Sequence, residues 1–155
     1  MKIGFITVFL MIFIALQAPV LLAADSGELR AEADQFYLQH DYKKASKIYF
    51  KLAKTGDHHS QARIAQMFAN GEGKSVDLTE AYAWSVLAEE GGEKFITEPS
   101  DVLLQRTGNK SSAQKKALKL QEKYGQQALK EKALKRSQAD AARRSGNSMG
   151  SNLSR

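Results

Sequence analysis

The sequence predicts an all-α protein, a short α-solenoid of two antiparallel helix hairpins followed by C-terminal capping helices. Three observations support this fold class. Beyond residue 25, apolar residues recur three and four positions apart, and no stretch alternates apolar and polar residues as a half-buried strand does. Aspartates precede and glycines follow the expected helices, as N-caps and helix stops do. Two segments also match each other at an offset of 36 residues, which is typical of stacked helical repeats.

Residues 1–24 are predicted to be a signal peptide rather than part of the fold. Lys2 is the only charged residue before Asp25, and the stretch between them is mostly apolar. The residues before Asp25 predict cleavage after Ala24, which would make the mature protein periplasmic or secreted. Residues 3–24 are also long enough to span ~30 Å of hydrocarbon, so an uncleaved segment would anchor the chain in the inner membrane.

The first hairpin, repeat 1, is expected over about residues 28–56 of a repeat domain that spans 26–92. Asp41 is placed to cap its second helix, and Gly56 is placed to end that helix. Each helix carries one apolar face. The residues of these faces are Leu29, Ala33, Phe36, Tyr37, Ala45, Ile48, Tyr49, Leu52 and Ala53.

The second hairpin, repeat 2, is expected over about residues 57–92. Its first helix follows Asp57 and ends at residues 70–73, because two glycines two positions apart permit left-handed backbone there. Asp77 is expected to cap the second helix, which Gly92 ends. The expected core positions are Ile64, Met67, Phe68, Ala81, Trp84, Leu87 and Ala88.

The repeat is carried by equivalent caps, apolar positions and glycines. The matched pairs are Asp41 and Asp77, Ala45 and Ala81, Ile48 and Trp84, Leu52 and Ala88, and Gly56 and Gly92. The second segment carries a specific pattern made of Gly56, Gln61, Ile64, Met67, the run 68–73 (FANGEG), Asp77, Ala81, Trp84, Ala88 and Gly92. In this pattern it resembles the Sel-one-like repeat, an α-helical repeat related to the tetratricopeptide repeat, of the exported bacterial type. Lys74 departs from the family, which has valine there, and we expect Val76 to supply the missing apolar contact.

Residues 93–128 are expected to form C-terminal capping helices, because two repeats alone leave apolar faces uncovered. Pro99 fits the first turn of a short helix over 101–106, and Ser111 or Ser112 is expected to cap a longer one. The apolar stripe of the longer helix comprises Ala113, Ala117, Leu120, Tyr124 and Ala128.

Charge is segregated along the chain. Residues 25–109 carry 10 basic and 14 acidic residues, whereas residues 110–155 carry 12 basic and 3 acidic residues. Such asymmetry is typical of a folded body with a charged arm. Residues 129–155 have few large apolar groups, and we expect them to form a basic, largely disordered tail.

This basic tail supports an alternative function, the binding of anionic lipid, cell-surface polymer or nucleic acid. Tyr124 is the only aromatic residue after residue 109, so no specific nucleic-acid recognition is expected. The competing interpretation of the tail is a solvated helix or linker.

The sequence contains no recognisable catalytic, metal or cofactor motif, and we expect no enzyme, no metal site and no cofactor. It has no cysteine, which excludes thiolate nucleophiles, zinc–thiolate sites and iron–sulfur clusters. The residues that follow the run 70–73 lack the Lys-Ser/Thr of a phosphate-binding loop. His58 and His59 are adjacent and point about 100° apart on a helix, so with His40 they do not predict a shared metal ion.

Glu89, Glu90 and Glu93 are the candidates for an enzymatic alternative, acid–base hydrolysis of cell-wall material. They lie at a helix end among glycines, without the apolar surroundings that raise the pKa of a catalytic carboxyl group. Solvated charges are the favoured interpretation.

The resemblance to Sel-one-like and tetratricopeptide arrays implies a function in protein binding. In such arrays the first helix of each pair lines the concave side, where partner proteins bind. We therefore expect a non-enzymatic protein–protein interaction module, an adaptor of the bacterial cell envelope that binds a protein or peptide through this concave face. The candidate partner-binding residues are Arg63, Gln66, Asn70, Tyr42 and Tyr82, of which the first three share one helical stripe. The competing interpretation is an ordinary solvated face.

Overall fold

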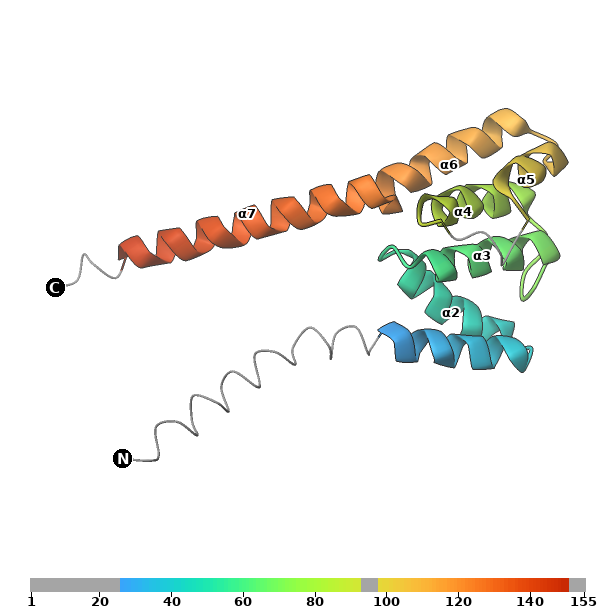
Figure 1. The fold of residues 1–155 in the computed structure, drawn as a ribbon, viewed down its shortest axis with the longest axis horizontal. Helices are drawn as coiled ribbons and strands as arrows, with labels where there is room; N and C mark the ends of the chain where they lie inside the picture. Colours follow the sequence, from blue (N-terminus) through green and yellow to red (C-terminus); the bar gives the residue numbers. More distant parts are fainter. Residues whose placement is uncertain (1–25, 93–97, 151–155) are drawn as a thin grey trace, which may run out of the picture.

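The computed structural model describes residues 26–92 and 98–150, and all regular structure in these ranges is helical (Figure 1). A helix over residues 26–38 is followed by α2 (Tyr42–Ala53), α3 (His58–Asn70), α4 (Leu78–Glu90), α5 (Ser100–Arg106), α6 (Lys110–Tyr124) and α7 (Gln126–Gly150). The all-α prediction is confirmed for this part of the chain. No helix within it is both long and apolar enough to cross a bilayer. The predicted signal peptide, residues 1–24, lies outside the described residues.

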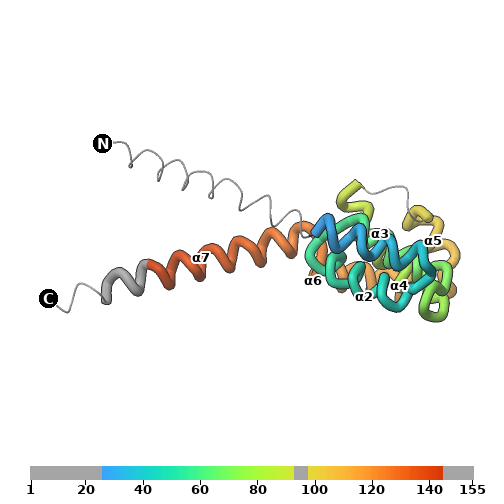
Figure 2. The backbone as a smooth tube through the Cα atoms, turned by 90° about the horizontal axis from the view of Figure 1, so that it is seen from below, coloured from blue at the N-terminus to red at the C-terminus, as the bar shows by residue number. Residues whose placement is uncertain are grey.

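The helices up to α6 pack on one another as a body, and α7 extends away from it (Figures 1 and 2). Helix α4 is central, because α3, α5 and α6 all contact it. The core of the body mixes large side chains with alanines that let neighbouring helices approach closely. Its buried residues are Ala33, Ala45, Tyr49, Ala53, Ile64, Ala65, Met67, Trp84 and Leu87.

The helix starts in the two hairpins lie where the sequence predicts them. The side chains of Asp41, Asp57 and Asp77 each accept a hydrogen bond from the backbone N–H three residues later. At the end of α3, Gly71 and Gly73 adopt φ values of 73° and 74°, a conformation that side chains with a Cβ resist. These aspartates and glycines therefore act as the helix boundaries that the sequence predicts.

Helix α6 packs on α4. Ala113 and Ala117 are buried, and the ring of Tyr124 stacks on Trp84 with a centroid distance of 5.9 Å. Trp84 is only 3% exposed, which confirms it as a core residue. Phe68 is half-buried rather than fully enclosed and packs against the core cluster.

The start and the end of α6 differ from the prediction. Asn109, rather than Ser111 or Ser112, is the N-cap, because its side chain accepts the hydrogen bond from the backbone N–H of Ser112. The helix ends at Tyr124 instead of continuing to residue 128, since Gly125 leaves the helical conformation with φ −66° and ψ 158°. The apolar stripe runs through this break, so it did not reveal the boundary.

Residues 126–150 form the helix α7, whereas the sequence analysis expected a largely disordered tail from residue 129 onward. The prediction of disorder is wrong for residues 129–150, because a helix can form here without burying an apolar face. This segment is instead rich in Ala, Lys, Gln, Arg and Leu, which have high intrinsic helix propensity. Residues 151–155 lie outside the described residues.

Lys74 itself makes the contact with the core that Val76 was expected to supply in its place. Its ammonium group lies 4.6 Å from the ring centroid of Phe50 and 4.9 Å from that of Phe68. Val76 is 57% exposed and is therefore largely outside the core. The lysine covers these aromatic rings with its stem and keeps its charge at the surface, which a valine would not do.

Candidate functional site

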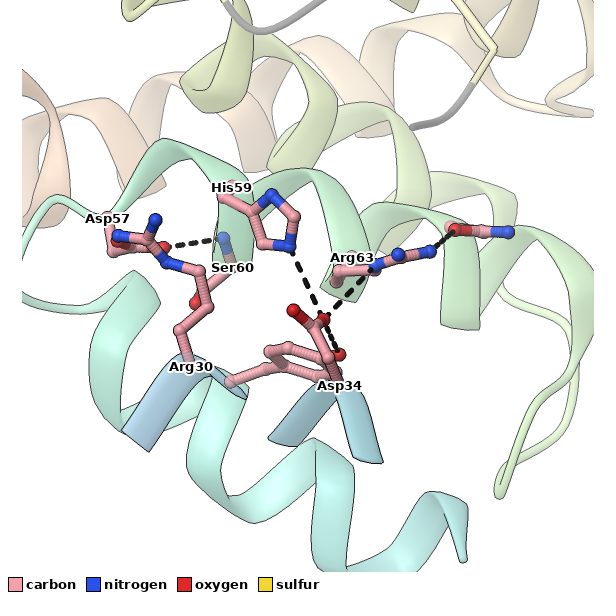
Figure 3. A network of polar contacts seen from close by, with 8 residues as sticks. Arg30, Asp34, Asp57, His59, Ser60 and Arg63 are labelled. Atoms are coloured by element: carbon pink, nitrogen blue, oxygen red, sulfur yellow. Dashed lines mark hydrogen bonds and ion pairs between the residues drawn. The ribbon is translucent and has the colours of Figure 1, made fainter. Parts of the chain in front are cut away.

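Helix 26–38 and α3 are joined by a set of polar side chains that we name the polar seam (Figure 3). Its members are Arg30, Asp34, Tyr37, Asp57, His59 and Arg63. On the first helix the members are spaced i, i+4 and i+7, which places them on one stripe. On α3, His59 and Arg63 share a stripe with Gln66 and Asn70 in the same way, so two polar stripes face each other.

Asp34 is the centre of the polar seam. Its carboxylate accepts a hydrogen bond of 2.5 Å from the hydroxyl of the buried Tyr49. His59 Nε2 and Arg63 Nε lie 3.4 Å and 3.8 Å from the same carboxylate oxygen. Burial, together with the hydrogen bond to Asp34, raises the pKa of Tyr49, so its hydroxyl remains a neutral donor. One carboxylate thus links the first helix to both α2 and α3.

Asp57 closes the polar seam at the start of α3. Its carboxylate accepts a 2.7 Å hydrogen bond from the backbone N–H of Ser60 and forms an ion pair with Arg30. Burial alone would raise the pKa of Asp57, but the hydrogen bonds from Ser60 and the charge of Arg30 outweigh it and lower this pKa. The same carboxylate therefore caps α3 and ties it to the first helix.

Arg63 connects the polar seam to two of the other candidate residues. Its guanidinium lies over the ring of Tyr37, 4.8 Å from the centroid, and donates to Gln66 Oε1 at 3.1 Å. The hydroxyl of Tyr37 donates to Glu72 at 2.8 Å, and Asn70 Nδ2 donates to the other oxygen of Glu72 at 3.1 Å. Burial and the bond to Glu72 raise the pKa of Tyr37. Contacts within the protein thus hold Arg63, Gln66 and Asn70.

The two candidate tyrosines are placed differently. The Tyr42 ring packs edge-on against Tyr37 at a centroid distance of 5.4 Å, and its hydroxyl is 2.8 Å from His40 Nδ1. Tyr82 is on α4, and no contact among the described residues joins its side chain to the other candidates. The structure therefore brings four of the five candidate residues into one connected region, without Tyr82.

Asp34, Tyr37 and Glu72 are not among the functional candidates that the sequence predicts. Tyr37 was assigned only to an apolar face, and Glu72 only to a turn. The missing signal was the polar stripe Arg30, Asp34 and Tyr37, whose spacing mirrors that of the stripe on α3. Pairing of the two stripes depends on how the helices pack, which the sequence pattern alone does not give.

The three histidines have separate environments. His58 Nδ1 lies 2.9 Å from Gln61 Oε1 and 3.1 Å from the carbonyl oxygen of Leu87, whereas His59 faces Asp34 and His40 faces Tyr42. Among the described residues, no group of three or more histidine, aspartate or glutamate side chains is arranged to hold a metal ion.

Glu89 and Glu90 make structural contacts at the end of α4. Glu89 accepts hydrogen bonds of 2.7 Å from both the backbone N–H and the hydroxyl of Ser100. Glu90 accepts from Gln121 Nε2 at 3.0 Å and from the backbone N–H of Gln126 at 2.9 Å. These carboxylates connect α4 to α5, α6 and α7. Glu93, the third member of the proposed acidic group, lies outside the described residues.

Two amide side chains on α3 each use one of their polar atoms in a contact within the protein. Gln66 uses its carbonyl oxygen for Arg63, and Asn70 uses its amide nitrogen for Glu72. Gln66 Nε2 and Asn70 Oδ1 have no partner among the described residues, so one donor and one acceptor lie a helical turn apart. No family model, curated protein or solved structure matches this chain.

Proposed function

We propose that this protein is a non-enzymatic adaptor of the bacterial cell envelope that binds a partner protein or peptide. The partner face comprises Arg63, Gln66 and Asn70 of α3 together with Glu72 and Tyr42. We place the two helix hairpins in the Sel-one-like and tetratricopeptide repeat class, stacked as a short solenoid with this face on its concave side.

Equivalent positions in the two hairpins support the repeat assignment. Asp41 and Asp77, 36 residues apart, both cap a second helix through a hydrogen bond to the backbone three residues later. Gly56 and Gly92, again 36 residues apart, both have positive φ, 94° and 78°. Two hairpins with the same start and the same stop are what duplication of one structural unit produces.

The observation that carries the binding proposal is the pair of α3 amides that each keep one polar atom without a partner among the described residues. Gln66 Nε2 is a donor and Asn70 Oδ1 an acceptor, and an extended peptide exposes one backbone N–H and one C=O per residue. Arg63 and Glu72 hold the other ends of these two amides in place. These two side chains then lose little conformational freedom on binding, and the small entropy cost favours affinity.

Site-specific crosslinking in intact cells tests this proposal. A photoreactive residue is placed at position 66 or 70 of the full-length chain, and control proteins carry it at position 35 or 39. Gln35, on the first helix, and Gln39, directly after its end, are exposed polar residues with the same i, i+4 spacing. We expect one protein adduct from positions 66 and 70 that positions 35 and 39 do not give.

Binding by the purified partner then tests the role of the amides. Gln66→Ala with Asn70→Ala is expected to weaken binding at least about tenfold, because two hydrogen bonds of roughly 1 kcal/mol each are lost. Gln35→Ala with Gln39→Ala is the matched control and leaves affinity unchanged. Equal adducts from both pairs of positions, or equal losses in both double variants, would contradict the proposal.

A further inference from the structure

The projecting part of α7 is strongly basic and fully exposed. Residues 130–144, which we name the basic arm, contain six basic and two acidic residues. Every side chain in the arm is exposed. A solvated helix with this excess of positive charge attracts an anionic surface over roughly the Debye length, about 8 Å at physiological ionic strength.

The side chains of the basic arm suit electrostatic adsorption rather than insertion or base recognition. At 100° per residue, Lys132, Arg136 and Arg143 fall within about 40° of one another and form one stripe. Leu134 is the only large apolar side chain in the arm, and no aromatic residue is present to stack on bases. The ligand surface must therefore be anionic, extended and contacted through charge.

Contacts at the base of α7 fix its direction. The backbone N–H of Gln126 donates to Glu90, and Gln126 Nε2 lies 3.2 Å from His58 Nε2. Leu129 lies so close to Gly56 that a Cβ on this glycine would be 2.8 Å from Leu129 Cδ1. The helix leaves the body from this point for about 37 Å, at 1.5 Å per residue.

Helix 26–38 and the basic arm both start from the same end of the body. Arg30, in the first helix, pairs with Asp57, which lies between Gly56 and His58, and both of these neighbours lie against the base of α7. Figures 1 and 2 both place the start of helix 26–38 and the start of α7 at the same end of the body. Residues 3–24, which carry no charge, precede this first helix in the sequence.

We propose that the basic arm binds the anionic surface of a lipid bilayer. An uncleaved segment 3–24 would anchor the chain in a bilayer, and helix 26–38, which follows it in the sequence, starts at the same end of the body as the arm. Negatively charged headgroups complement the stripe of the arm, and each lysine or arginine near such a surface raises the partition coefficient about fivefold. This inference does not depend on the partner face, which is formed by other helices.

Vesicle quenching on the full-length chain tests the inference. The chain has no cysteine, so Ser137→Cys creates a single site for a fluorophore on the arm. Ser75→Cys, in the exposed loop at the other end of α3, carries the control fluorophore. Vesicles of phosphatidylcholine alone, or with about one third phosphatidylglycerol, contain a quencher attached to a headgroup. We expect quenching at position 137 only in anionic vesicles and its loss at high salt, with none at position 75.

Charge variants with the same net change separate the arm from the body. Arg136→Gln with Arg143→Gln should lower the partition coefficient onto anionic vesicles by about tenfold or more. Lys43→Gln with Lys47→Gln, which removes two exposed cations from α2, should leave it unchanged. Equal quenching in neutral and anionic vesicles, or equal losses in both variants, would overturn the proposal. Release of the arm from anionic vesicles by duplex DNA at equal phosphate concentration would also overturn it and assign the arm to nucleic acid.

Discussion

Helices α4 and α7 occupy opposite extremes of burial in this chain. Helix α4 is contacted by α3, α5 and α6, and its residues Trp84 and Leu87 are almost completely buried. Beyond Leu129, every described side chain of α7 is exposed. Helix α4 is stabilised by tertiary packing, whereas α7 depends on helix propensity and local charge pairs. The same secondary structure thus has two physical origins within one chain.

Trp84→Ala should break the buried side of this comparison and have the largest effect. Trp84 packs edge-on against Phe50 at 5.6 Å and stacks with Tyr124 at 5.9 Å. We expect a loss of about 3–5 kcal/mol in the free energy of unfolding, because a cavity is left between three helices. Leu134→Ala, at a side chain 57% exposed on α7, should cost less than about 0.5 kcal/mol. Urea unfolding followed by circular dichroism measures both, and similar losses would contradict the comparison.

Gly91→Ala should weaken the contact between the body and α7. A Cβ at this position would be 2.0 Å from His58 Cδ2, so the imidazole must move away from the carbonyl of Leu87 and from Gln126. We expect a loss of about 1–3 kcal/mol, as for overpacking of a closely packed site. Gly108→Ala is the matched control, because nothing lies within 4 Å of the added methyl group. Thermal unfolding should therefore show a lower Tm for the first variant only.

Asp57→Asn should remove a pH-dependent part of the stability of the body. The pKa of Asp57 is lower in the folded protein than its usual value of 3.8, so its carboxylate stabilises the fold above this pH. This contribution is lost as the pH falls through the folded pKa. Asparagine still caps α3 but cannot pair with Arg30, which is 38% exposed, so we expect a loss of at most about 1 kcal/mol at neutral pH.

The check on Asp57 is the free energy of unfolding measured between neutral pH and pH 2. The difference between Asp57→Asn and the unmodified chain should shrink below pH 3.8. A difference that stays constant with pH would show that the charge of Asp57 makes no contribution. Arg30→Gln should cause a loss that does not add to that of Asp57→Asn.

Glu131→Gln should have the smallest effect and should be confined to α7. Glu131 pairs with Lys135 one turn later at 2.6 Å, and this lysine lowers the pKa of Glu131. Loss of the pair should reduce the helical Cα chemical shifts of the arm and leave the Tm of the body unchanged. Glu122→Gln on α6, at an exposed residue without an ion pair among the described residues, is the control. A change in the Tm of the body would contradict the independence of the two regions.

The sequence predicts best those features that depend on a few neighbouring residues. Asp41, Asp57 and Asp77 cap their helices as expected, because an N-cap needs only its own side chain and the backbone three residues later. The burial of Trp84 follows from the periodicity of its helix.

Features that depend on how helices pack, and helices that remain exposed to solvent, were predicted less well. The polar seam requires Asp34 to face His59, 25 residues away, and the spacing of either stripe alone does not reveal this pairing. Tyr82 lies on α4 and Arg63 on α3, and the packing of these helices decides that the two side chains do not share one region. Helix α7 has no continuous apolar face to predict it, although its composition favours a helix without burial.

Gly125 is a buried residue that connects α6 to the start of the long helix α7. From this residue α7 runs about 37 Å, so a tilt of about 10° at Gly125 would sweep its tip through roughly 6 Å. The contacts that set the tilt are few, chiefly those of Gln126 with Glu90 and His58. A small shift of the end of α4 would therefore produce a larger displacement at the far end of α7.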